Sequence, residues 1–167
     1  EESASQVKLR AERLGANKQE SLQFVASTSA DDIAATIRSA AYDLIIVDSI
    51  QTLALDEISS APGTVSQITN SSNVIIRAAK ETNAAVILVG HVTKEGSIAG
   101  PKVLEHLVDV VLQFEGDRYG GFKMLRAAKN RFGSTSEVAI FEMFEECLRL
   151  VENPSAALLA ERQDADG

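Results

Sequence analysis

Three stretches of the sequence place charged or polar side chains directly after runs of apolar residues. Asp48 and His91 each follow a run of aliphatic residues, and Lys129 and Arg131 lie in the stretch KNRFG, which ends a further apolar run. A carboxylate can hold a magnesium ion through its water shell. Lysine and arginine side chains bind phosphate oxygens. These residue types therefore suit the chemistry of a phosphate-bearing ligand, if the fold brings them to one.

The stretch YDLIIVDS, residues 42–49, carries Asp48 at the end of four aliphatic residues. In open α/β folds, ligands bind at the carboxyl edge of a parallel sheet. There an aspartate can hold a magnesium ion that neutralises the phosphates of a nucleotide. The stretch thus has the shape of a Walker B strand. An aspartate that merely ends a strand would show the same pattern, so both interpretations stay open.

The stretch 90–106 joins a strand to a glycine-broken loop that carries Lys94 and Lys102. His91 could contact the terminal phosphate of a nucleotide, and the two lysines could contact DNA. Long loops in compact domains are often functional, which favours these roles. The alternatives are a histidine satisfied by polar neighbours and two solvated lysines.

The stretch KNRFG ends a strand expected over 122–129. Lys129 and Arg131 alternate with the period of a strand, which predicts that they share one face. Their ammonium and guanidinium groups suit phosphate oxygens. We expect Phe132 to anchor the turn in the core and Gly133 to adopt a positive φ. A charged edge strand that discourages aggregation is the simpler interpretation of the two cations when the stretch is taken alone.

Glu1 and Glu2 precede an expected helix. Acidic residues at a helix start are favoured by the helix dipole, by about 0.3–1 kcal/mol, and this explains them without any catalytic role. In an ATPase, a glutamate near a strand end would instead polarise the attacking water as a general base.

The amino-acid composition limits the classes of protein to which the chain can belong. The 167 residues are 45% hydrophobic and 24% charged, with a formal net charge of −8, and these values are typical of one soluble globular domain. The single cysteine, Cys147, suits a reducing cytosol. No apolar run is long enough to span a membrane. The acidic balance argues against a generally basic nucleic-acid surface, so DNA contacts should be local and on loops.

In the first half, apolar runs alternate with helical patterns, which predicts parallel strands covered on both faces. A capping box at Ser29 and Asp32 should open the second helix. The third helix should place Val65, Ile68, Ile75 and Ala79 on one side. Helices are expected over 4–14, 29–41 and from 65 onward, and strands over 22–25, 44–47 and 85–89, the last two fully buried.

The second half has shorter connections, which join antiparallel neighbours. A short helix is expected over 102–106, followed by strands over 108–114, 122–129, 138–144 and 148–151. The fold class predicted is therefore α/β with a mixed sheet, parallel in its first half and antiparallel in its second. Residues 1–152 should form one domain, and residues 153–167 resemble a linker.

Six stretches in this order closely resemble the bacterial RadA (Sms) family, DNA repair and recombination ATPases with a RecA-like P-loop NTPase core. They are EES at the start, YDLIIVDSIQT, SSAPGTVSQI, GHVTKEGSIAGPKVLEHLVD, KNRFG and NPSA. The resemblance spans the chain from Glu1 to about Ala157. KNRFG and the stretch containing GPKVLEH are its most diagnostic parts.

The resemblance implies roles for particular residues. Glu1 or Glu2 is similar to the catalytic glutamate of RecA-like enzymes. Asp48 matches the Walker B aspartate that would hold Mg²⁺ through water, with Ser49 beside it, and His91 lies where such proteins carry a nucleotide sensor.

The remaining implied roles concern cations. The loop over 92–100 is similar to the region that touches single-stranded DNA, so Lys94 and Lys102 are candidate DNA contacts. Lys129 and Arg131 match the cations of the family motif and would reach the nucleotide of the adjacent subunit, or couple it to DNA.

The family implies ATP and Mg²⁺ as cofactors, single-stranded or branched DNA and the RecA recombinase as partners, a hexameric ring, a cytoplasmic location and no membrane contact. The sequence departs from the family pattern in three ways. It has no four-cysteine zinc module, no G-x-x-x-x-G-K-[ST] loop and no Lon-protease-like domain. The chain is therefore expected to correspond to the later part of the ATPase domain, and not to hydrolyse ATP by itself. Apolar faces meant for the absent strand and helix should be exposed unless another chain covers them.

The leading hypothesis is thus the core segment of a DNA-dependent ATPase that promotes branch migration of recombination intermediates. One alternative is another RecA-like ring ATPase, such as a replicative helicase or a clock-protein relative. A second is a non-catalytic RecA-like module that serves in assembly or DNA binding.

Overall fold

A computed structural model describes residues 4–39, 42–91, 103–116, 121–144 and 147–153. The chain divides into two compact units, each taken by itself below. The first unit comprises Glu1–Val7 and Ser21–Leu107, and the second comprises Lys8–Glu20 and Val108–Gly167. Helix α1 (Ala4–Arg13) contributes to both, and Gly15 follows it with a φ of 68°. The predicted first helix and its glycine stop are confirmed.

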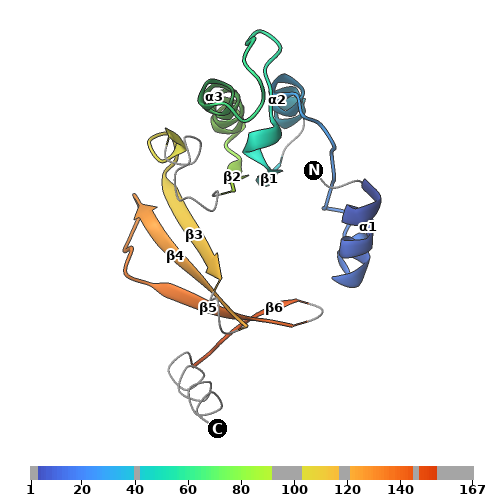
Figure 1. Ribbon diagram of the computed structural model, residues 1–167. Helices are drawn as coiled ribbons and strands as arrows, with labels where there is room; N and C mark the ends of the chain where they lie inside the picture. Colours follow the sequence, from blue (N-terminus) through green and yellow to red (C-terminus); the bar gives the residue numbers. More distant parts are fainter. Residues whose placement is uncertain (1–3, 40–41, 92–102, 117–120, 145–146, 154–167) are drawn as a thin grey trace. The chain divides into compact units, whose positions relative to one another are not determined.

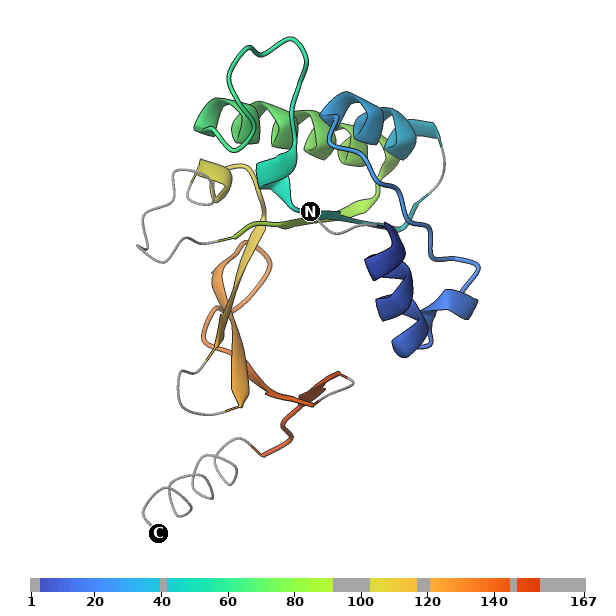
Figure 2. The same cartoon turned by 45° about the vertical axis from the view of Figure 1, so that its right-hand side comes forward.

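The first unit is built on two parallel strands, β1 (Leu44–Asp48) and β2 (Ala85–Val89), which pair from Leu44↔Ala85 to Asp48↔Val89. Helices α2 (Ala30–Ser39) and α3 (Val65–Thr82) lie side by side over this strand pair (Figures 1 and 2). The helices and strands enclose a continuous apolar core. Its buried members are Ala30, Ala34, Ile37, Val47, Leu53, Leu55, Ile75 and Ala78.

Side-chain hydrogen bonds cap the starts of α2 and α3, and a left-handed residue ends α3. The Thr64 hydroxyl accepts a hydrogen bond from the backbone N–H of Gln67 and so caps α3. Asn83 ends this helix in the left-handed conformation, with a φ of 57°. At α2, the Ser29 hydroxyl accepts from the backbone N–H of Asp32 at 3.2 Å. This bond is the serine half of the predicted capping box.

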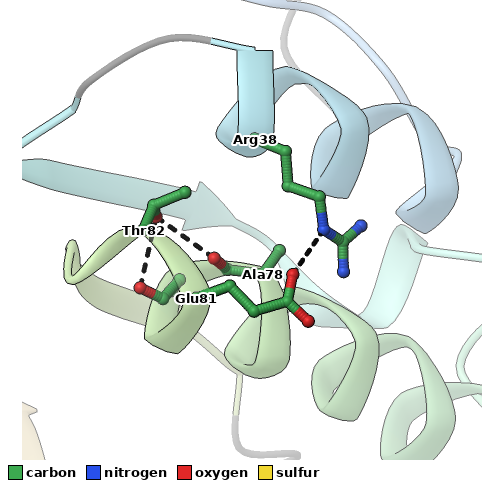
Figure 3. Close-up of polar contacts among 5 residues, drawn as sticks. Arg38, Ala78, Glu81 and Thr82 are labelled. Atoms are coloured by element: carbon green, nitrogen blue, oxygen red, sulfur yellow. Dashed lines mark hydrogen bonds and ion pairs between the residues drawn. The ribbon is translucent and has the colours of Figure 1, made fainter.

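An ion pair joins the two helices at their carboxyl-terminal ends. Arg38 Nε on α2 donates to Glu81 Oε2 on α3 at 2.6 Å (Figure 3). This hydrogen bond and the charge of the guanidinium hold the pKa of the Glu81 carboxyl below its usual value. On the same turn, the Thr82 hydroxyl donates to the backbone oxygens of Ala78 and Ala79.

The segment between β1 and α3 begins with the short helix η2 (Ile50–Thr52) and then follows an irregular path to Thr64. The buried Gln67 side chain on α3 holds this path in place. Its Oε1 accepts from Leu55 N at 2.9 Å, and its Nε2 lies within hydrogen-bond distance of the backbone oxygens of Leu55, Ile58 and Ser60. One amide thus satisfies several backbone groups of a segment that has no regular structure.

The second unit contains the short helix η1 (Ala16–Lys18) and a four-stranded antiparallel sheet of order β3-β4-β5-β6. The strands are β3 (Val110–Gly116), β4 (Phe122–Asn130), β5 (Val138–Met143) and β6 (Leu148–Leu150). The β3–β4 register shifts between Val111 and Leu112, which leaves one extra residue on β4 between Lys129 and Ala127. This irregularity lies next to the KNRFG stretch.

The fold class predicted from the sequence is confirmed, as are its parallel first half and antiparallel second half. In the described part of the chain these halves form two sheets and not one continuous sheet. Of the short helix expected over 102–106, Val103 and Leu104 are helical. The proposed boundary at residue 152 stays a prediction, because residues 154–167 lie outside the described part, as do Ala40 and Ala41.

Three details of the sequence prediction are wrong. Residues 22–25 form no strand, and the pairing that follows them is an isolated bridge between Ser29 and Ala54, in which Ala54 N donates to Thr28 O. The strands β1 and β2 are not fully buried, since Ile46 is 61% exposed and Ile87 is also exposed. A strand pair covered on one face buries only alternate residues. Val65, at the first turn of α3, is exposed and not part of the core.

Candidate functional site

The first candidate site lies at the carboxyl ends of β1 and β2. Because the strands are parallel, Asp48 at the end of β1 and His91 just after β2 come to the same edge. His91 Nε2 lies 3.8 Å from Asp48 Oδ1, and both side chains are largely exposed. The structure therefore brings together two residues that the sequence analysis selected independently.

Gln51 and Gly90 lie next to this pair. Gln51 Nε2 donates to the backbone oxygen of His91 at 3.1 Å, which ties the η2 turn to the end of β2. A Cβ on Gly90 would lie 3.3 Å from Ile50 Cδ1, a close approach that favours glycine there. Neither Gln51 nor Gly90 was predicted to have a role in the site. A lone glutamine has no chemical signature, and only its place three residues after Asp48 could have singled it out.

Two buried polar atoms at this edge have no hydrogen-bond partner among the described residues. They are the Ser49 hydroxyl and Gln51 Oε1. The Asp48–Ser49 peptide bond is cis. Asp48 points its carboxylate outward, whereas Ser49 is buried. A magnesium ion prefers oxygen ligands and keeps several waters, and the exposed Asp48 carboxylate fits that preference.

The other predicted residues of this site fall outside the described part of the chain. Glu1 and Glu2 precede it, and Lys94 and Lys102 lie in the span 92–102. Their proposed roles as general base and as DNA contacts therefore stay predictions. No group of three His, Cys, Asp or Glu residues that could hold a metal occurs within the ranges that the structure describes.

The second candidate site is the end of β4 in the second unit. Lys129 Nζ donates to the backbone oxygen of Val108 at 2.8 Å. Arg131 Nη1 pairs with Asp109 Oδ1 at 2.9 Å, and its backbone N–H donates to the oxygen of the same residue. Both cations are thus directed at the segment that enters β3.

Two expectations about this turn are wrong. Phe132 does not anchor the turn in the core, because its side chain is 80% exposed. Gly133 does not adopt a positive φ, since Gly15 and Gly63 are the described glycines that do. Asn130 supplies the anchoring instead, as its side chain accepts from Phe132 N and donates to Ser134 O.

Solved structures with a similar fold show which fold this chain adopts. An ATPase domain covers 90% of the chain with a TM-score of 0.68 and 15% identity, and the match spans 61% of that structure. The RadB recombinase covers 90% of the chain with a TM-score of 0.54 and 17% identity, over 74% of its own length. The fold is that of a RecA-like ATPase domain.

Curated relatives define the family. The chain is 51% identical to the DNA repair protein RadA of Brucella abortus over 98% of its length, 51% identical to that of Bacillus subtilis over 97%, and 50% identical to that of Streptococcus pneumoniae over 98%. Over the span it covers, the chain belongs to the RadA family of DNA repair proteins. It spans 35% to 39% of the length of these relatives. No protein-family model matches the chain. None of the described helices is both long and apolar enough to cross a membrane.

Proposed function

We propose that the chain is the core segment of an ATPase that acts on DNA in homologous recombination and repair. The observation that carries this proposal is the identity of about half of its residues to DNA repair proteins named RadA, over nearly its whole length. The adjacency of Asp48 and His91 at the carboxyl edge of a parallel strand pair supports it, because RecA-like folds bind nucleotides at that edge.

In this proposal, the first unit supplies the residue that holds the metal ion and the residue that senses the nucleotide. Asp48 holds Mg²⁺ through water, Ser49 lies beside it, and His91 responds to the terminal phosphate of ATP. Glu1 or Glu2 orients the attacking water as general base. When bound, the magnesium ion neutralises the charge of the phosphates. The His91–Asp48 contact at 3.8 Å provides a direct route by which the nucleotide state can shift the end of β2.

The second unit supplies Lys129 and Arg131, which contact the nucleotide of a neighbouring subunit in a hexameric ring. Lys94 and Lys102 contact single-stranded or branched DNA. The RecA recombinase is the proposed protein partner, and the cytoplasm the proposed location. Arg131 can leave Asp109 at little cost, because their pair is exposed and such pairs contribute about 0–1 kcal/mol.

Arg131 and Arg126 give a matched test of this proposal. Both are exposed arginines of the second unit, and each pairs with one carboxylate, Asp109 and Glu115 respectively. In the full-length protein, Arg131→Ala is expected to abolish DNA-stimulated ATP turnover and branch migration while the subunit still folds. Arg126→Ala loses an equivalent ion pair and should retain both activities.

The measurements are ATP turnover with and without single-stranded DNA and the movement of a labelled branched junction. If Arg131→Ala keeps wild-type turnover and strand movement, Arg131 has no part in the mechanism. If the full-length wild type shows no ATP turnover that DNA stimulates, the proposed ATPase function itself is wrong.

A further inference from the structure

Phe132 is the most exposed large apolar side chain in the described part of the chain, at 80% exposure. A single exposed apolar residue is common on protein surfaces and needs no explanation by itself. This one differs in two respects that the structure shows directly. It stands on a turn that is held by side-chain hydrogen bonds, and it lies next to Arg131 and three residues after Lys129.

The Asn130 side chain holds the turn on both sides of Phe132. Its Oδ1 accepts from Phe132 N at 3.0 Å, and its Nδ2 donates to Ser134 O at 3.3 Å. Ser134 Oγ then accepts from the backbone N–H of Ser136. A Cβ on residue 133 would lie 3.4 Å from Asn130 Nδ2, an ordinary van der Waals distance, so the amide packs closely against the turn. The turn thus presents the Phe132 ring outward in a defined position.

The surroundings of the ring decide which kind of partner fits it. A purely apolar protein surface over Phe132 and the neighbouring Arg131 would take the Arg131–Asp109 ion pair out of water, and desolvating an ion pair is costly. A nucleotide offers both parts of a matching ligand, a flat base for the ring and a phosphate for the guanidinium. The exposed Arg131–Asp109 pair is weak enough to be exchanged for such a phosphate.

We propose that Phe132 is a stacking surface for a nucleobase whose phosphate contacts Arg131. This proposal rests on the proposed function. It adds Phe132 to Lys129 and Arg131 as a residue of the KNRFG stretch that contacts the ligand. The base has two possible sources with the same chemistry, an unpaired base of DNA and the adenine of ATP. Asn130 acts as a positioning residue, because its side-chain hydrogen bonds hold the turn that carries Phe132.

The test uses the full-length protein and compares Phe132→Ala, Phe132→Trp and the control Phe24→Ala. Phe24 is an exposed phenylalanine of the first unit, outside both candidate sites. The ligands are a labelled oligothymidylate, an abasic oligonucleotide of equal length, and ATP with Mg²⁺. The abasic strand keeps the phosphates and lacks the bases, so it separates stacking from charge attraction. Thermal melting of each variant monitors its folding.

If the base belongs to DNA, Phe132→Ala should weaken binding of the oligothymidylate about 5- to 150-fold, the range expected for loss of one stacked base. Binding of the abasic strand should not change, and Phe132→Trp should restore affinity. If the base belongs to ATP, the same loss should appear in ATP affinity, with oligothymidylate binding unchanged. Phe24→Ala should bind every ligand as the wild type does.

Two results would overturn the stacking role while the proposed function stands. The first is wild-type binding of both base-bearing ligands by Phe132→Ala. The second is a fall of the melting temperature of Phe132→Ala by more than about 5 °C, which would mean that the ring packs inside the protein. A wild-type protein that binds neither DNA nor ATP would instead overturn the proposed function, and the stacking role with it.

Discussion

The Gln67 side chain offers a quantitative test of how the segment between β1 and α3 is held. This residue is 2% exposed, and it bonds the backbone N–H of Leu55 and carbonyl oxygens of Leu55, Ile58 and Ser60. Methionine fills a similar volume but makes none of these bonds, so Gln67→Met removes the hydrogen bonds with little change of packing.

The expected cost follows from which groups lose their partner. The N–H of Leu55 becomes a buried donor without an acceptor, which costs about 1–3 kcal/mol. The bonds to Ile58 and Ser60 are only partly buried, so water can replace them, and each loss costs less. The free energy of unfolding should therefore fall by about 2–4 kcal/mol.

Urea unfolding measures this loss, and amide hydrogen exchange at Leu55 reports its location. Asn70→Leu is the matched control, because it removes an exposed amide of the same helix that bonds only to the Ser66 oxygen of its own helix. The control should change the free energy of unfolding by less than about 0.5 kcal/mol. A Gln67→Met protein as stable as the control, with the Leu55 amide still protected, would refute this account of the segment.

Two further predictions concern the first unit. Ile75→Ala should lower the free energy of unfolding by about 2–5 kcal/mol in urea titrations, since Ile75 is fully buried in the core and its loss leaves a cavity; a loss below 1 kcal/mol would mean that the site collapses or that the core is not packed as described. Glu81→Gln should be less stable than wild type near neutral pH, because Arg38 lowers the pKa of the folded-state carboxyl. That stabilisation is fully present above the ordinary glutamate pKa of about 4.3 and is lost as the pH falls through the lower folded-state pKa. Melting temperatures of the two proteins should therefore converge in acid, and a difference that persists at pH 2 would contradict the role of the ionised carboxylate.

The helices and strands were predicted from the spacing of apolar residues and the lengths of the turns, which depend on neighbouring residues alone. The 3.6-residue spacing of Ile68, Ile75 and Ala79 predicted α3. The short turns predicted an antiparallel second half, and its strands appear within about two residues of the expected bounds. Alternation of apolar runs with helices likewise predicted the parallel pairing of β1 with β2.

The errors concern properties that no single segment determines. Residues 22–25 have the composition of a strand, but a strand also needs a backbone partner, and pairing begins only at Thr28. The aliphatic run of β1 indicated burial on both faces, whereas Ile46 is exposed in the described structure. Phe132 was assigned to the core by residue type alone, and the hydrogen bonds of Asn130 decide otherwise.

The candidate site was predicted in part. Asp48 and His91 were found because each ends an apolar run, and parallel pairing brings such ends together. Gln51 was missed, because its bond to the backbone of His91 depends on the path of η2 and not on a sequence signature. The sequence also could not predict that Lys129 contacts Val108 and Arg131 contacts Asp109. These contacts arise from the register of β3 against β4.

Asp48 is proposed to hold the catalytic metal ion of an ATPase whose activity DNA stimulates. The most direct test is the rate of ATP hydrolysis by the full-length protein with single-stranded DNA, for wild type, Asp48→Asn and the control Asp56→Asn, an exposed carboxylate in the segment before α3. Loss of a group that holds the catalytic metal removes several kcal/mol of transition-state stabilisation, so Asp48→Asn should lower the rate by about a hundredfold or more. Asp56→Asn should hydrolyse ATP as the wild type does. An Asp48→Asn protein that retains the wild-type, DNA-stimulated rate would contradict the account.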